Sequence, residues 1–534
     1  MTDNPVASDR DWRRRPPTFA VPETAVRRLA LRPVPAPGKN STPTLYSANR
    51  LIVAGVDPSN SSTALDELHG LAARLNMEMS VTLLHSPEFF ELRGRFNERV
   101  DTTMQSRIDL FAFGDRSEPD AWELLSRARE ERLEIADSLA LSHVLVAAGL
   151  QGVGYVSGVG YVSGVGYVSG VGYVSGVGYV SGVGYVSGVG YVSGVGDAVP
   201  GAPSGRVPVA WPGNVPVATP DAYSPTVVIL DTGLGEHPWF DDPATVTRDP
   251  HVLNDPIVLG FAPAENPELT GITLDPINQA LDAMAGHGTF IAGIIRAACP
   301  SAHLISVPVM YGDGTCDESE LIAALEKLYD RHLLSLTGRI EEPPLDIVNI
   351  SMGYYHEDPQ GVSNTVGLTS ALNKLAGAGV TIVASAGNGG SDVEFWPAAM
   401  SQASMALNGA PIVSVGSCDP GSHVVSHFSN TGDWVRVYCP GAGIVSTLPV
   451  TFDGCAQAGV RAQPQNDPVR GTVDMDDFSG GFGMWNGTSF SAPLFVGRLA
   501  QKLVEKPTLS LSPDDKAAQA WAIVDDLCQT RGLK

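Results

Sequence analysis

The sequence predicts an α/β fold with a doubly wound, mostly parallel sheet and helices on both faces. Beyond about residue 205, five short runs rich in β-branched residues alternate with helical stretches; they begin at Thr226, His303, Leu345, Val380 and Pro411. These runs are apolar almost throughout, which is typical of strands buried on both faces of a parallel sheet. Alternation of such strands with helices predicts helices on both faces.

A second, smaller α/β domain is predicted over residues 48–150. Its expected elements are a strand at 51–56, a helix at 62–75, strands at 79–85 and 107–113, and a largely helical stretch at 121–149. The helical assignments rest on apolar residues spaced at three and four positions. Before this domain, residues 1–47 are rich in proline and arginine and lack hydrophobic periodicity, which predicts a disordered leader.

A low-complexity linker is predicted over residues 151–204. Within it the hexapeptide GVGYVS occurs seven times without error, from Gly152 to Ser193. Because the period is even, each copy could place its side chains alike on a stacked β-structure. Two glycines in six make ordering costly in conformational entropy, so an elastin-like flexible tether is the favoured interpretation. We therefore expect a connector leading to a larger domain at 205–534.

Composition limits the classes of partner. The formal net charge of −24 argues against nucleic acid and anionic membranes, which both favour a basic surface. The longest apolar run, residues 139–150, is too short to span a bilayer, and the first thirty residues contain no apolar signal core. We therefore expect a cytoplasmic protein, with export by a non-standard route left open. Six scattered cysteines give neither a disulfide framework nor a zinc spacing.

Three separated motifs each place a reactive side chain where a strand ends or a helix begins. Asp231 follows the strand that begins at Thr226, His287 opens an apolar helix within GHGTFIAG, and Ser489 begins another helix within GTSFSAP. A serine hydroxyl becomes a good nucleophile when a histidine takes its proton, and a carboxylate can orient that histidine and stabilise its charged form. The helix start also offers backbone N–H groups to an oxyanion.

Asp, His and Ser in this order, each in its own glycine-flanked motif, resemble the subtilisin-like serine peptidases, the subtilase family (peptidase S8 type). The resemblance covers roughly residues 205–505 and implies a serine endopeptidase that forms an acyl-enzyme on Ser489. It implies that Asn388 of the SAGN motif completes the oxyanion hole with the Ser489 backbone. It also implies a peptide-binding edge formed by Ser351, Met352, Gly353, Ala386 and Gly387.

Several alternatives remain open from the sequence. A peptide cyclase or transpeptidase would use the same residues, and a catalytically silent peptide-binding module would retain the fold. His237 is a rival base near Asp231, although subtilases often carry a His-Pro there without a catalytic role. The acidic residues Asp313 to Glu320 are expected to be a solvated face; a structural calcium ion is conceivable, but no motif indicates one and no cofactor is required.

The expected partner is a polypeptide substrate. In many subtilases a small α/β propeptide templates folding and inhibits the enzyme until it is cleaved, so residues 48–150 are either such a prodomain or a fixed regulatory domain. The first reading predicts intramolecular inhibition and self-cleavage between about residues 150 and 205, because the linker lies there.

Overall fold

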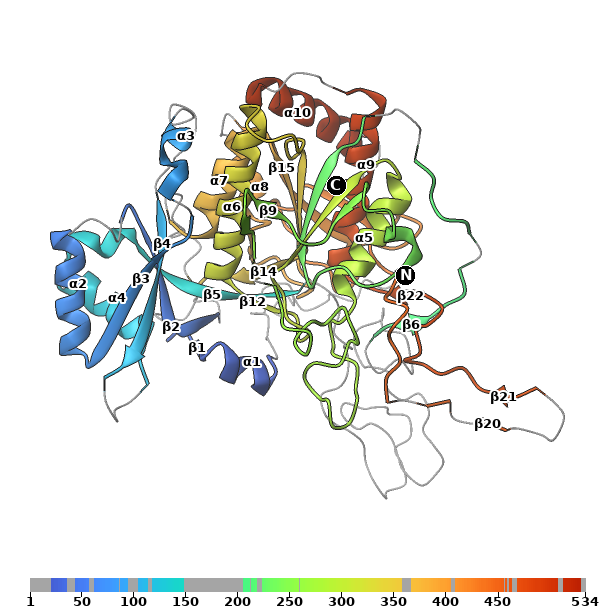
Figure 1. Ribbon diagram of the computed structural model, residues 1–534, viewed down its shortest axis with the longest axis horizontal. Helices are drawn as coiled ribbons and strands as arrows, with labels where there is room; N and C mark the ends of the chain where they lie inside the picture. Colours follow the sequence, from blue (N-terminus) through green and yellow to red (C-terminus); the bar gives the residue numbers. More distant parts are fainter. Residues whose placement is uncertain are drawn as a thin grey trace, which may run out of the picture.

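The computed structural model describes residues 21–35, 44–56, 62–85, 87–94, 104–113, 118–147, 205–211, 213–218, 223–258, 260–357, 366–404, 409–455, 457–458, 461–462, 468–507 and 512–529. The predicted hexapeptide linker lies outside these residues. Within them, the larger part of the chain forms a sandwich of helices around a parallel sheet, and the smaller N-terminal part lies against one side of it (Figure 1).

The parallel sheet confirms the predicted fold class. Its strands, in spatial order, are β18 (Val437–Pro440), β17 (Ile412–Cys418), β15 (Thr381–Ser385), β13 (Ile347–Ile350), β7 (Thr226–Asp231), β11 (His303–Pro308) and β8 (Val246–Thr247). Every neighbouring pair in this order is parallel. All five runs expected to be strands are therefore strands of this sheet.

Helices cover both faces because alternate side chains of each strand enter different cores. Val227 and Ile229 of β7 pack with α5 (His287–Ala298) and α9 (Thr488–Glu505). Val228 and Leu230 pack on the opposite side with α6 (Glu318–Leu336) and α7 (Leu368–Gly377). Figure 1 shows α6 and α7 on one side of the sheet and α5 and α9 on the other.

Shorter elements surround this core. They are α8 (Met400–Ser404), α10 (Pro513–Gln529), η5 (Pro238–Phe240), β6 (Val207–Pro208), β9 (His251–Val252), β10 (Asp255–Pro256), β16 (Phe395–Trp396), β19 (Ile444–Thr447), β20 (Arg461–Ala462), β21 (Arg470–Gly471) and β22 (Phe482–Trp485). Among the residues that are described, no helix combines the length and the apolar character needed to cross a membrane. The cytoplasmic location stays a prediction.

The N-terminal part is a second, antiparallel sheet with the helices α2 (Thr63–Arg74) and α4 (Ala121–Glu130) on one face (Figure 1). Its other elements are α1 (Glu23–Arg28), β1 (Leu31–Pro33), β2 (Leu45–Ala54), β3 (Met77–Leu83), η2 (Pro87–Phe89), α3 (Phe90–Gly94), β4 (Gln105–Ala112), η3 (Glu134–Ser138) and β5 (Leu139–Ala147). Strands β3, β4, β2 and β5 lie side by side in that order and pair antiparallel. The disordered leader expected over 1–47 is wrong for 21–35, which contain α1 and β1, and for 45–47, where β2 begins.

The helical prediction for the end of this domain is also wrong. Helix α4 stops at Glu130, and β5 is an extended strand. It runs out of the N-terminal sheet and lies antiparallel between β12 (Thr315–Asp317) and β14 (Met352–Tyr355) of the larger domain. Backbone pairing on both sides outweighs the helix propensity of its leucines and alanines, because a strand flanked on both sides satisfies its N–H and C=O groups.

The acidic segment expected to be a solvated face instead forms the contact with the N-terminal part. Asp313, Asp317 and Glu318 are each at most 2% exposed. Arg28 pairs with Asp313 at 2.8 Å, and Arg50 pairs with Asp317 at 3.2 Å. Complementary charges supplied by the N-terminal part make it possible to bury these carboxylates.

One buried histidine of α6 makes the stability of the fold depend on pH. The Nδ1 atom of His332 accepts a hydrogen bond from the Leu345 backbone N–H at 3.0 Å, so Nε2 carries the proton, 3.1 Å from the Ala378 carbonyl. Burial lowers the pKa of His332 to about 3 from the usual 6.5. Between these pH values the unfolded chain therefore binds more protons at His332 than the folded chain does. As a result, the free energy of unfolding decreases as the pH falls below about 6.5.

We expect the free energy of unfolding to lose about 3 kcal/mol from this group between pH 7.5 and pH 4. The test compares urea denaturation of the wild type and His332→Asn at both pH values. Asparagine does not titrate, so the stability gap between the two proteins should shrink by about that amount at the lower pH. A gap that is the same at both pH values would contradict the prediction.

Candidate active site

The site is built at the carboxyl edge of the parallel sheet, where Asp231 ends β7 and His287 opens α5. His287 Nδ1 lies 2.7 Å from Asp231 Oδ1, and both side chains are 0% exposed. The same carboxylate oxygen accepts the Thr232 backbone N–H at 2.8 Å. Asp231 therefore holds one nitrogen of the imidazole and leaves Nε2 facing away from it.

A close backbone approach explains why glycines flank these residues. The Gly288 N–H donates to Thr232 Oγ1 at 2.8 Å. A Cβ atom added to Gly288 would lie 2.1 Å from the Gly233 carbonyl oxygen, far inside van der Waals contact. The turn after β7 and the first turn of α5 can approach this closely only with glycine at position 288, and this approach brings Asp231 within reach of His287.

Ser489 lies in the first turn of α9 and is also fully buried. Its hydroxyl donates to the Ser351 carbonyl at 3.1 Å, while His287 Nε2 has no hydrogen-bond partner among the described residues. The Ser351 hydroxyl in turn donates to the Ser489 carbonyl at 3.1 Å. The structure thus forms the Asp231–His287 link but directs the serine hydroxyl to the residue that follows β13.

Asn388, just beyond β15, is tied to the same helix start. Its Oδ1 atom accepts the Thr488 backbone N–H at 3.0 Å and the Thr488 hydroxyl at 2.9 Å. The Gly387 N–H donates to that hydroxyl at 3.1 Å. Two donors on the amide oxygen fix the orientation of the side chain, so its Nδ2 side is turned away from Thr488.

Comparison with known proteins identifies the family of this chain. A sequence model described as the subtilase family matches residues 223–523, more than half of the chain. The chain belongs to the subtilase family. It is 25% identical over 241 residues to subtilisin DY of Bacillus licheniformis, covering 42% of this chain and 66% of that protein. It is 30% identical over 210 residues to the minor extracellular protease Epr of Bacillus subtilis, covering 36% of this chain and 28% of Epr.

The chain therefore spans less than two thirds of these curated relatives; for subtilisin E of Bacillus subtilis the share is 47%. Among solved structures it is similar to fervidolysin from Fervidobacterium pennivorans, described as a keratinolytic enzyme related to subtilisin. The TM-score is 0.45 at 16% identity, over 87% of this chain and 56% of fervidolysin.

In this subtilase the expected peptide-binding edge is a strand already paired with another. Met352 lies opposite Ala147 of β5, and Gly353 lies opposite Val146. A Cβ atom on Gly353 would lie 2.4 Å from the Trp396 carbonyl, so a side chain there would displace the neighbouring β16. Ala386 and Gly387 lie beyond β15, where the Ala386 carbonyl accepts a hydrogen bond from Asn430 at 2.8 Å.

A buried carboxylate that the sequence did not single out supports the Asp231–His287 pair. Glu268 accepts hydrogen bonds from the hydroxyls of Thr232 and Thr289, which flank Asp231 and His287 in sequence. Burial raises the pKa of Glu268, whereas the two threonines lower it. Glu268 comes from a loop without periodicity or motif, so no local signal marks it; its contacts make it a positioning residue for the pair.

Replacing Glu268 with leucine should leave the Thr289 hydroxyl without its acceptor and the Thr232 hydroxyl with only the bond of 3.2 Å to Asp231 Oδ1. We expect the free energy of unfolding to fall by about 2 to 4 kcal/mol, and kcat on a peptide substrate to fall at least about tenfold with a smaller change in KM. Glu236→Leu is the matched control, because Glu236 is exposed in the same region. Equal stabilities and equal kcat values for the two variants would rule out this role for Glu268.

His237, the rival base near Asp231, lies outside the Asp231–His287 pair. Its Nδ1 accepts the Trp239 N–H at 3.1 Å, and burial lowers its pKa to about 4. This is a structural role at the start of η5.

Elsewhere, Asp453, Asp474 and Asp476 bring one carboxylate oxygen each within 4.8 Å of one another. Oxygen ligands suit calcium, but acidic clusters of this kind also occur without an ion, so no metal is assigned.

Proposed function

We propose that this subtilase is a serine endopeptidase that cuts polypeptides through an acyl-enzyme. The observation that carries the proposal is the hydrogen bond of 2.7 Å between Asp231 and His287. The His287 ring also lies 5.4 Å, between ring centroids, from Phe490, the residue that follows Ser489 at the start of α9. A rotation of the Ser489 side chain away from the Ser351 carbonyl would free its hydroxyl for His287 Nε2. Family membership adds the chemical class of the reaction.

In this mechanism Ser489 Oγ attacks the carbonyl carbon of the scissile peptide while His287 Nε2 takes the hydroxyl proton. Asp231 stabilises the imidazolium that forms. The negative carbonyl oxygen would be received by Asn388 Nδ2 and the Ser489 backbone N–H. His287 then gives its proton to the departing amine as the C–N bond breaks, and water releases the acyl group by the reverse sequence.

The substrate would bind as an extended strand on β14, through main-chain hydrogen bonds. Strand β5 pairs with β14 along this edge and with β12 on its other edge. We therefore propose that the N-terminal part inhibits the peptidase by filling its own substrate groove. Ser351 contacts Ser489 and immediately precedes β14, with which Ala147 pairs. The peptide bonds soon after Ala147 would therefore be the first of this chain to be cut by Ser489.

A fluorophosphonate probe and a peptide digest test the function together. Stoichiometric labelling at Ser489 would exclude the silent binding module, and mass spectrometry of the products separates hydrolysis from cyclisation or transpeptidation. Hydrolysed peptides with free carboxyl ends are the expected products. Absence of both labelling and cleavage, even after the chain has been nicked beyond Ala147, would overturn the proposal.

A further inference from the structure

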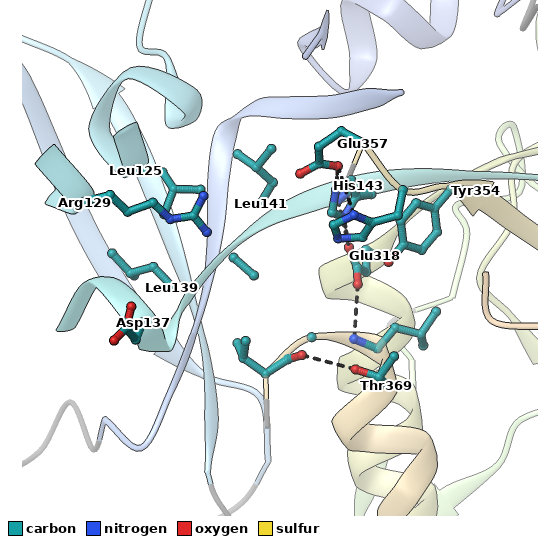
Figure 2. Close-up of a pocket in the computed structure, with 15 residues that line it drawn as sticks. Leu125, Arg129, Asp137, Leu139, Leu141, His143, Glu318, Tyr354, Glu357 and Thr369 are labelled. Carbon is teal, nitrogen blue, oxygen red and sulfur yellow. Dashed lines mark hydrogen bonds and ion pairs between the residues drawn. The ribbon is translucent and has the colours of Figure 1, made fainter. Parts of the chain in front are cut away.

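The contact between β5 and the peptidase domain contains a charged cluster centred on His143. His143 Nδ1 lies 2.7 Å from Glu318 Oε2, and Nε2 lies 2.9 Å from Glu357 Oε2. Tyr354 stacks on the imidazole, with ring centroids 4.5 Å apart and planes inclined by 17°. Figure 2 shows the imidazole between the two carboxylates, with the tyrosine ring alongside.

The carboxylates of this cluster favour the positively charged form of His143. Burial by itself lowers the pKa of His143, but the carboxylates of Glu357 and Glu318 outweigh it and raise the pKa to about 10. Burial also disfavours the charged form of Glu357 and by itself raises its pKa, but His143 brings this pKa down to about 2. At neutral pH an imidazolium is therefore held by two carboxylates and an aromatic face, all from the peptidase domain.

The position of His143 on β5 shows where this charged cluster lies along the proposed substrate groove. Leu145 lies opposite Cys316 of β12, and Ala147 lies opposite Met352 of β14. Because side chains alternate along a strand, His143 shares a face with Leu145 and Ala147. If β5 lies as a substrate would, its side chains fill the substrate's own subsites, and His143 fills one remote from Ser489.

We propose that Glu318, Glu357 and Tyr354 form a subsite that binds a cationic side chain of the extended polypeptide substrate, at the place taken by His143 of β5. This inference rests on the proposed peptidase function. A cavity of about 370 Å³ adjoins the cluster and is lined by Glu318, Tyr354 and Glu357 together with residues of the N-terminal part such as Leu141 (Figure 2). When a substrate replaces β5, the peptidase-domain wall of this cavity remains, and it leaves room for lysine and arginine, which are longer than histidine.

A divalent cation is the main competing occupant. His143, His356 and Glu357 bring one nitrogen or oxygen atom each within 4.8 Å of one another. The stacked tyrosine and the second carboxylate on the other ring nitrogen favour the side-chain cation, because an aromatic face stabilises a flat cation and contributes no bond to a metal.

The test uses the full-length protein, incubated until self-cleavage is complete and then given a diverse peptide library. We expect lysine, arginine and histidine to be enriched about tenfold or more at a single position before the cut. The distance from that position to the cut should equal the distance from His143 to the protein's own cleavage point, mapped by mass spectrometry. Glu357→Gln should remove most of the enrichment, while peptides with neutral residues there are still cut.

Glu505→Gln is the control, because Glu505 is a half-exposed carboxylate at the end of α9 that pairs with Lys502 of the same helix. It should keep the wild-type enrichment. An active protein without enrichment, or with equal enrichment in Glu357→Gln, overturns the subsite and leaves the peptidase function standing. Enrichment that disappears on adding a chelator would also overturn it, in favour of a metal. A protein that cuts nothing overturns the peptidase function itself.

Discussion

Replacing Ser489 with alanine should reduce peptide hydrolysis by roughly a millionfold, the size of effect known when subtilisin loses its nucleophile. The change removes only the hydroxyl, which donates to the Ser351 carbonyl at 3.1 Å, so the fold should be retained. The measurements are kcat on a chromogenic peptide and labelling by a fluorophosphonate. Both should be at background in the variant, because neither reaction can proceed without the nucleophilic oxygen.

The same variant tests the inhibitory role of the N-terminal part. Wild-type protein should cut itself within a few residues after Ala147, whereas Ser489→Ala should remain a single chain. Ser491→Ala is the matched control, since Ser491 is a buried serine of the same helix and should leave self-cleavage intact. If the wild type also stays whole, the N-terminal part is a fixed domain and not a cleaved one.

The parallel sheet could be predicted because its strands carry their own signal. A strand buried on both faces, such as β7, needs apolar residues at every position, and this is visible in a window of six residues. The motifs around Asp231, His287 and Ser489 were equally local, because close backbone approaches require glycine at fixed neighbouring positions.

The missed features all depend on contacts between distant parts of the chain. Strand β5 contains leucine and alanine, which favour a helix, and its partner strands β12 and β14 lie more than 160 residues further along. The acidic segment looked solvated because the arginines that neutralise it belong to the N-terminal part. Glu268 comes from a loop and acquires its role only through Thr232 and Thr289.

Replacing Arg93 with alanine should strongly weaken the attachment of the N-terminal part. Arg93 of α3 is 2% exposed and reaches α6, where its Nη1 donates to Glu326 at 2.5 Å and its Nε donates to Asp330 at 2.7 Å. Burial raises the pKa of Asp330 to about 6 even with the arginine present. Removing the guanidinium would leave this carboxylate buried without its cation, at a cost of about 3 to 5 kcal/mol.

Measured in the Ser489→Ala background, which keeps the chain whole, the loss should appear as a lower urea midpoint. In the wild-type background it should appear as faster fluorophosphonate labelling of Ser489, because a loosened N-terminal part withdraws β5 from the groove more often. Arg74→Ala is the control: Arg74 and its partner Glu131 are 58% and 44% exposed, and such surface pairs contribute at most about 1 kcal/mol. If Arg93→Ala and Arg74→Ala shift stability and labelling equally, the buried ion network does not hold the N-terminal part on the peptidase domain, and pairing of β5 with β12 and β14 must suffice.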